Sequence, residues 1–128
     1  MGYRIDYAVR DGMLRAVVSG RTGARAGGTY APWIARDIAE QAGRATVSRV
    51  LIDLRGLSDR LGSLGALSLA ACGPRQIGGY RVAVVDSIEH DAYYALHEMA
   101  ARARGYVLRC FGSAADAVRW LRSTPARD

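Results

Sequence analysis

Four ionisable side chains lie close together after an apolar segment and offer the residue types for general acid–base catalysis or for a metal ion. They are Asp86, Glu89, His90 and Asp91. The simpler interpretation is the entry to a helix, where acidic residues complement the helix dipole. An enzyme built on this group remains the weakest of the hypotheses considered below.

A histidine in the next segment resembles half of a zinc-protease motif. His97-Glu98 begins that motif, but Ala101 stands where the second histidine is required. One histidine cannot hold the ion alone. The chain has no complete catalytic or metal-binding motif, so we expect a protein that is not an enzyme and uses no cofactor.

A glycine-rich segment at 23–30 has the glycine spacing of a phosphate-binding loop. Thr29 replaces the lysine of such loops, and Tyr30 replaces the hydroxyl residue that binds magnesium, so nucleotide hydrolysis is excluded. A backbone cradle for an anion, helped by Arg21 or Arg25, stays open. The plainer interpretation is a turn between a strand and a helix.

These residues lie between segments that alternate in type. Strands at 3–10 and 13–19 are joined by Asp11-Gly12, the dipeptide of a tight hairpin. Apolar strands are predicted at 50–54, 80–86 and 107–111, and helices at 29–43, 63–73, 91–104 and 113–121. Gly43 is expected to end the first helix, Met99 and Ala103 to lie on the apolar side of the third, and Ser113 to cap the last.

The order β-β-α-β-α-β-α-β-α predicts an α/β fold with a mostly parallel sheet and one antiparallel strand at the amino end. A length of 128 residues suits a single domain, 1–128, with an ordered core at about 3–121 and a tail at 122–128. Half of the residues are apolar, enough for a core without disulfides or metal.

The net charge is +6, and every one of the 18 basic residues is an arginine. The chain contains no lysine and also no asparagine. That bias is typical of a GC-rich genome, and the arginines are spread along the chain rather than gathered as in nucleic-acid binders. Cys72 and Cys110 lie in apolar segments without metal-ligand spacing. No apolar run reaches the length of a membrane span. We expect a cytoplasmic protein that binds neither nucleic acid nor membrane.

The element order, the strand at 51–57 and the closing segment at 111–121 resemble the STAS superfamily. Within it, they are most similar to the bacterial proteins related to the sporulation anti-sigma-factor antagonist. The resemblance covers about Tyr3 to Leu121. It implies a non-enzymatic regulatory domain that binds a protein partner through the loop after the third strand and the helix that follows. In the antagonists proper, that helix begins with a serine phosphorylated by a kinase.

The family pattern Asp-Leu-Ser-Gly-Val-Ser-Phe-Ile-Asp-Ser-Ser-Gly-Leu aligns without gaps with residues 53–65, and Ser63 falls on the phosphorylated serine. Three neighbours depart from the pattern, namely Leu61, Gly62 and Leu64. A phosphate there would add almost two negative charges beside unpaired backbone N–H groups. Without a phosphate, Ser63 is simply the cap of a helix.

The first hypothesis is therefore a regulatory domain whose docking surface is the loop 56–62 with the helix 63–72. Its site residues are Asp53, Gly56, Ser58, Ser63 and Leu64. The partner is a protein, and a second copy of the chain is one candidate. The alternative is a domain that binds a small ligand, a lipid or a nucleotide, at an edge containing Arg21, Arg25, Asp86 and His90.

Overall fold

The computed structural model describes residues 3–20, 31–57, 81–86, 98–99, 102–103, 105 and 107–123. Within these ranges, five strands form one sheet in the order β1-β2-β3-β4-β5. The strands are β1 (Tyr3–Arg10), β2 (Met13–Gly20), β3 (Arg49–Leu57), β4 (Arg81–Val85) and β5 (Val107–Phe111), and the helices are α1 (Ala31–Ala45) and α4 (Ala114–Ser123).

The pairing of the strands confirms the predicted α/β class. β1 is antiparallel to β2, whereas β2, β3, β4 and β5 are parallel to one another. The predicted helix at 63–73 lies outside the described residues, and that at 91–104 is described only at 98–99 and 102–103, which are helical. α4 ends two residues beyond the expected end of the core, at Ser123.

The turn between β1 and β2 is the predicted tight hairpin. Asp11 and Gly12 both have positive φ, 56° and 73°. Two successive residues of this kind define a type I′ turn, whose twist matches that of the flanking strands. The turn fixes the register in which Arg10 lies opposite Met13.

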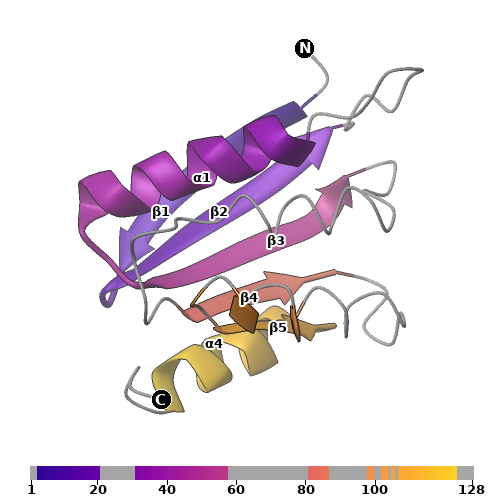
Figure 1. Cartoon of the computed structure of the whole chain (residues 1–128). Helices are drawn as coiled ribbons and strands as arrows, with labels where there is room; N and C mark the ends of the chain where they lie inside the picture. Colours follow the sequence, from indigo (N-terminus) through magenta and orange to yellow (C-terminus); the bar gives the residue numbers. More distant parts are fainter. Residues whose placement is uncertain are drawn as a thin grey trace.

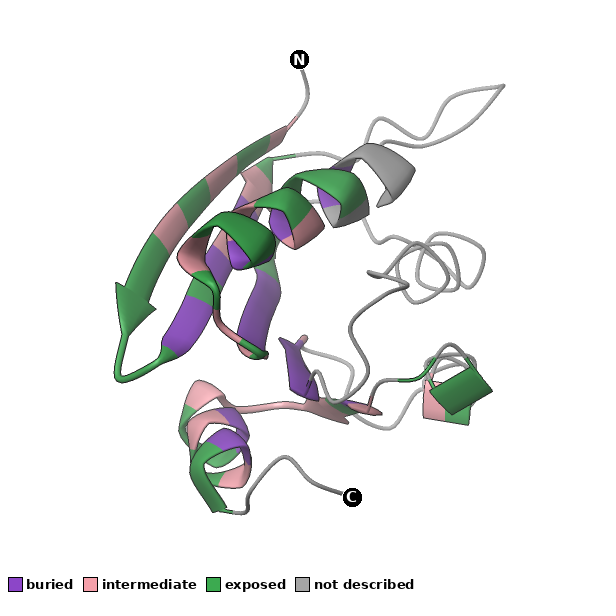
Figure 2. Ribbon diagram, turned by 60° about the vertical axis from the view of Figure 1, so that its left-hand side comes forward, coloured by how far each residue is buried: buried purple, intermediate pink, exposed green. Residues whose placement is uncertain are grey.

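Of the described helices, α1 lies on one face of the sheet and α4 on the other (Figure 1). Successive strand residues point to opposite faces, so Leu14 and Val50 lie under α1 while Leu51 lies under α4. α1 contributes Ile34, Ile38 and Ala42 to one core cluster, and α4 contributes Ala117 and Leu121 to the other. Burial on both faces explains the nearly continuous apolar runs of the inner strands (Figure 2).

The prediction that Gly43 ends the first helix is wrong. α1 continues to Ala45, and the reversal comes at Thr46, whose φ is 52°. The N–H of Thr46 donates to the carbonyl of Gly43 at 3.2 Å, and that of Val47 donates to Ala42 at 3.3 Å. These two bonds form a Schellman motif, which is set by the residue in the left-handed conformation rather than by the nearest glycine.

Thr46→Gly is expected to raise the free energy of unfolding by about 1 kcal/mol. A β-branched residue is strained at positive φ, and glycine adopts this conformation without a steric penalty. Urea denaturation followed by circular dichroism measures the change. Thr46→Ala is the control, because it removes the β-branch but keeps the Cβ. A lower stability of the glycine variant than of the alanine variant would contradict the strain argument.

The described part of the segment before β5 confirms one expectation and adds an observation. Met99 is 63% exposed and Ala103 is also exposed. Helical spacing predicts that residues share a side, but it does not predict what covers that side. Gly105, with φ of 94° and an N–H bonded to Arg102 O at 3.0 Å, ends the helix as predicted.

Candidate functional site

The candidate site lies at the carboxyl edge of the sheet, where β3, β4 and β5 end side by side (Figure 1). Open α/β sheets commonly bind their ligands at this edge. The described residues there include Asp53 to Gly56 from β3, Asp86 after β4, and Cys110 and Ser113 at and after the end of β5. They include three residues that the sequence predicted for a site: Asp53, Gly56 and Asp86.

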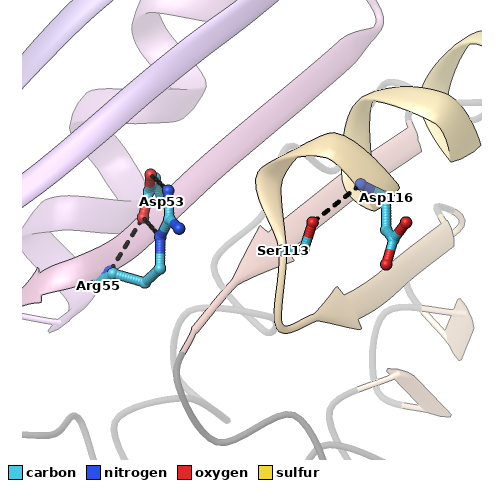
Figure 3. A network of polar contacts seen from close by, with 4 residues as sticks. All are labelled: Asp53, Arg55, Ser113 and Asp116. Atoms are coloured by element: carbon cyan, nitrogen blue, oxygen red, sulfur yellow. Dashed lines mark hydrogen bonds and ion pairs between the residues drawn. The ribbon is translucent and has the colours of Figure 1, made fainter.

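An ion pair between Asp53 and Arg55 dominates the end of β3. The two residues are separated by one position in a strand, so their side chains point to the same face. Arg55 Nε lies 3.0 Å from Asp53 Oδ1, and Arg55 Nη2 lies 2.8 Å from Oδ2. The backbone N–H of Arg55 also donates to Oδ1, at 3.0 Å (Figure 3). The carboxylate is thus engaged through both of its oxygens.

The two partners differ in exposure. Asp53 is only 6% exposed, whereas the Arg55 side chain is 44% exposed. The side-chain hydrogen bonds from Arg55 lower the pKa of Asp53, against the opposing effect of burial, and the backbone hydrogen bond and the charges of Arg55 and Arg15 lower it further. The same carboxylate raises the pKa of Arg55. A permanently charged guanidinium is therefore held in a fixed orientation at the surface.

The sequence nominated Asp53 for partner docking, and that role stays a prediction. The structure shows that the Asp53 carboxylate is buried and binds the Arg55 guanidinium. The sequence analysis did not name this partner. The signal was present, because a carboxylate inside an apolar strand needs a cationic partner and the alternate position carries an arginine.

Gly56 has a structural reason to be a glycine. The pairing of β2 with β3 shifts register between Val17 and Ser19, and Gly56 lies opposite Ser19. A Cβ on Gly56 would lie 3.0 Å from Val18 O and 3.1 Å from Ser19 Cβ. Such contacts are tighter than most real Cβ contacts, so a side chain at this position would require the neighbouring strand to shift slightly. Gly56 thus lets the two strands approach near the end of β3, which continues to Leu57, so the loop predicted from residue 56 begins after that residue.

The ends of β4 and β5 are tied together by a backbone bond, from Asp86 N to Phe111 O at 3.0 Å. Cys110 is half-buried nearby. Burial, followed by the charges of Glu98 and Asp86, raises the pKa of the Cys110 thiol far above its usual value. The thiol stays protonated at neutral pH, and a protonated thiol is a poor nucleophile.

The first turn of α4 borders the same edge (Figure 3). Ser113 Oγ accepts the backbone N–H of Asp116 at 3.3 Å, which confirms the predicted cap. The Asp116 carboxylate does not complete a capping box, because it accepts from Arg119 Nη1 at 3.2 Å. The cap fixes where α4 begins relative to β5.

Six predicted site residues fall outside the described part of the chain, so their places stay predictions: Arg21, Arg25, Ser58, Ser63, Leu64 and His90. Over the ranges that the structure describes, no three metal-binding side chains gather into a group. Over the same ranges, no helix combines the length and apolar character needed to cross a membrane.

Comparison with known proteins places this geometry in a recognised fold. No protein-family model matches the chain, and no curated protein sequence is significantly similar to it. The chain is similar in structure to an anti-sigma factor antagonist from Mycobacterium paratuberculosis, with a TM-score of 0.56 and 16% sequence identity. The match covers 94% of this chain and 95% of that chain. The expected STAS fold is confirmed, with an antiparallel amino-terminal hairpin and the other strands parallel.

Proposed function

We propose that this chain is a non-enzymatic regulatory domain that binds a protein partner at the carboxyl end of β3. The docking surface consists of Arg55, the loop 56–62 and the segment 63–72. Two observations support the proposal: the fold of a protein described as an anti-sigma factor antagonist, and the exposed arginine at the start of this loop. By the same likeness, the partner proposed is an anti-sigma factor.

The observation that carries the proposal is the Asp53–Arg55 pair. A free surface arginine loses side-chain entropy when it binds, but the buried carboxylate has already restricted Arg55. The remaining N–H donors of its half-exposed guanidinium suit a carboxylate on the partner. The partner surface is therefore proposed to carry an acidic residue opposite Arg55.

Arg55→Ala is expected to weaken partner binding at least tenfold, because the loss of one well-oriented charged contact is worth about 1.5–3 kcal/mol. The untagged protein is first purified from its own host and examined by native mass spectrometry to identify the stoichiometric partner. Binding of the purified partner to each variant is then measured by calorimetry, well below the melting temperature of that variant.

Arg122→Ala is the matched control. Arg122 also forms a 2.8 Å ion pair with an aspartate. Its partner, Asp11, lies in the turn between β1 and β2, at the end of the sheet opposite to the carboxyl end of β3. The Arg122→Ala variant should bind like the unchanged protein. The proposal fails if no protein co-purifies, or if the two variants lose affinity equally. The same spectra show whether the protein carries phosphate, and peptide mapping shows whether that phosphate is on Ser63.

A further inference from the structure

β1 presents a long edge along which another strand can add. It is the outermost strand of the sheet, and among the described strands it pairs only with β2 (Figure 2). Exposed edges offer unpaired backbone donors and acceptors, and proteins cover or obstruct such edges. Neither described helix lies along this edge, since α1 and α4 pack on the two faces of the sheet.

The hairpin determines which backbone groups point outward. In a type I′ turn the two flanking residues, Arg10 and Met13, share the closing hydrogen bond, and bonded pairs then alternate along the ladder. The even-numbered residues of β1 therefore direct their N–H and C=O groups toward β2. Tyr7 and Val9 direct theirs toward the open edge.

We infer that two copies of this chain pair antiparallel along β1, about a two-fold axis through Ala8. In this register Tyr7 lies opposite the partner's Val9, and their outward backbone groups meet. Asp6 lies opposite the partner's Arg10, and Ala8 opposite the partner's Ala8. The two sheets become one continuous sheet. This inference is independent of the function proposed above.

Charge selects among the registers. An axis through Asp6 would bring two aspartates together, and an axis through Tyr7 would oppose Arg4 and Arg10, so like charges disfavour both. An axis through Ile5 would place Arg4 opposite the partner's Asp6. An axis through Ala8 places Asp6 opposite the partner's Arg10. Both of these registers pair opposite charges. In the monomer Asp6 already accepts from Arg4, at 3.2 Å, and an axis through Ala8 preserves that pair.

The exposed apolar surface distinguishes the two registers that unite opposite charges. Val9 is 56% exposed, one of two large apolar side chains so exposed in the described part of the chain. The axis through Ala8 covers it with the partner's Tyr7, an aromatic and β-branched pair of the kind that stabilises sheets. With the axis through Ile5, no residue of the partner's described β1 lies opposite Val9, so its side chain stays exposed. Both charge complementarity and burial thus favour Ala8.

Arg10→Glu is expected to raise the dimer dissociation constant at least tenfold, because it replaces two attractive pairs by two repulsive ones. Sedimentation equilibrium of the full chain over a range of concentrations measures this constant. Arg119→Glu is the matched control, since it makes the same change of charge on α4, which packs on β3, β4 and β5 rather than on β1, and it should dimerise like the unchanged protein. Asp6→Arg should dissociate like Arg10→Glu.

Mixing supplies the decisive test. An equimolar mixture of Arg10→Glu and Asp6→Arg chains should form a heterodimer, because every charged pair across the interface is then attractive. A chain that stays monomeric at millimolar concentration, equal effects of Arg119→Glu and Arg10→Glu, or a mixture that does not associate would each overturn the inference.

A cross-link tests the register without relying on charge. Directly opposed residues of a non-hydrogen-bonded pair have Cα atoms about 4.5 Å apart, close enough for a disulfide. Ala8→Cys should give a disulfide-linked dimer on mild oxidation, mapped to residue 8 by mass spectrometry, whereas Arg4→Cys should not. A cross-link at residue 4 but not at residue 8 would overturn the register.

Discussion

Leu121→Ala is expected to lower the free energy of unfolding by about 3 kcal/mol and the melting temperature by about 10 °C. Leu121 is 0% exposed and, with Ala117, joins α4 to the core cluster on that face of the sheet. α4 is a helix of 10 residues, too short to be stable alone, so its stability depends on this contact. Truncation leaves a cavity between α4 and β4 that the backbone can fill only in part.

Urea denaturation monitored by circular dichroism measures this loss. Arg119→Ala is the control on the same helix: its ion pair with Asp116 is exposed on both sides, so less than about 0.5 kcal/mol should be lost. A loss below 1 kcal/mol for Leu121→Ala would mean that α4 contributes little to the core.

Asp53→Ala is expected to lower the free energy of unfolding by about 2 kcal/mol. The substitution removes three hydrogen bonds donated by Arg55 to a buried carboxylate. It also removes the cost of burying that charge, which limits the loss. The released guanidinium is already half-exposed and returns to water. Denaturation at pH 7 measures the effect, and Asp116→Asn, an exposed aspartate, should lose less.

The contribution of Asp53 should depend on pH in a defined direction. Its pKa in the folded protein is lowered from 3.8, so the unfolded chain binds the proton more readily. The contribution is therefore complete above about pH 5 and is lost as the pH falls below 4 toward the folded pKa. The stability difference between the unchanged protein and Asp53→Asn should be flat from pH 7 to 5 and shrink below pH 4. A difference that grows on acidification would contradict this assignment.

The two proposed interfaces use different parts of the sheet. The partner surface begins at the carboxyl end of β3, and the dimer uses the outer edge of β1, separated from β3 by β2. Arg55→Ala should therefore leave the dimer dissociation constant unchanged. Arg10→Glu should leave affinity for the purified protein partner unchanged, so failure of either proposal is recognised separately.

Some features of the fold were readable because they depend on neighbouring residues. Asp11-Gly12 specified its turn, Ser113 its cap and Gly105 its helix end, each through the backbone of a few adjacent residues. The apolar run at 50–54 predicted a strand covered on both faces, and those residues are all buried. The prediction of the first helix end was wrong, because a glycine at position 43 is compatible with a helix that continues to Ala45.

The burial of Arg81 against Trp120 could not be predicted from the neighbouring residues. Arg81 opens β4 and is 5% exposed, an unexpected place for an arginine. Its guanidinium lies 4.1 Å from the centre of the Trp120 ring, and Nη2 donates to Trp120 O at 3.1 Å. These residues are 39 positions apart, so no pattern in either segment predicts the contact. The helix end supplies the negative partial charge and the ring supplies the covering surface.

The sequence by itself determined the order of the described strands and helices, and the parallel sheet with its antiparallel hairpin. Periodicity and turn chemistry are properties of short segments, which any chain of these residues would express. The tertiary structure decided that the Asp53 carboxylate is buried while Arg55 is half-exposed, that Arg81 is buried on Trp120, and that β1 pairs only with β2 among the described strands. Each of these depends on which distant segments become neighbours, and packing of the whole sheet settles that.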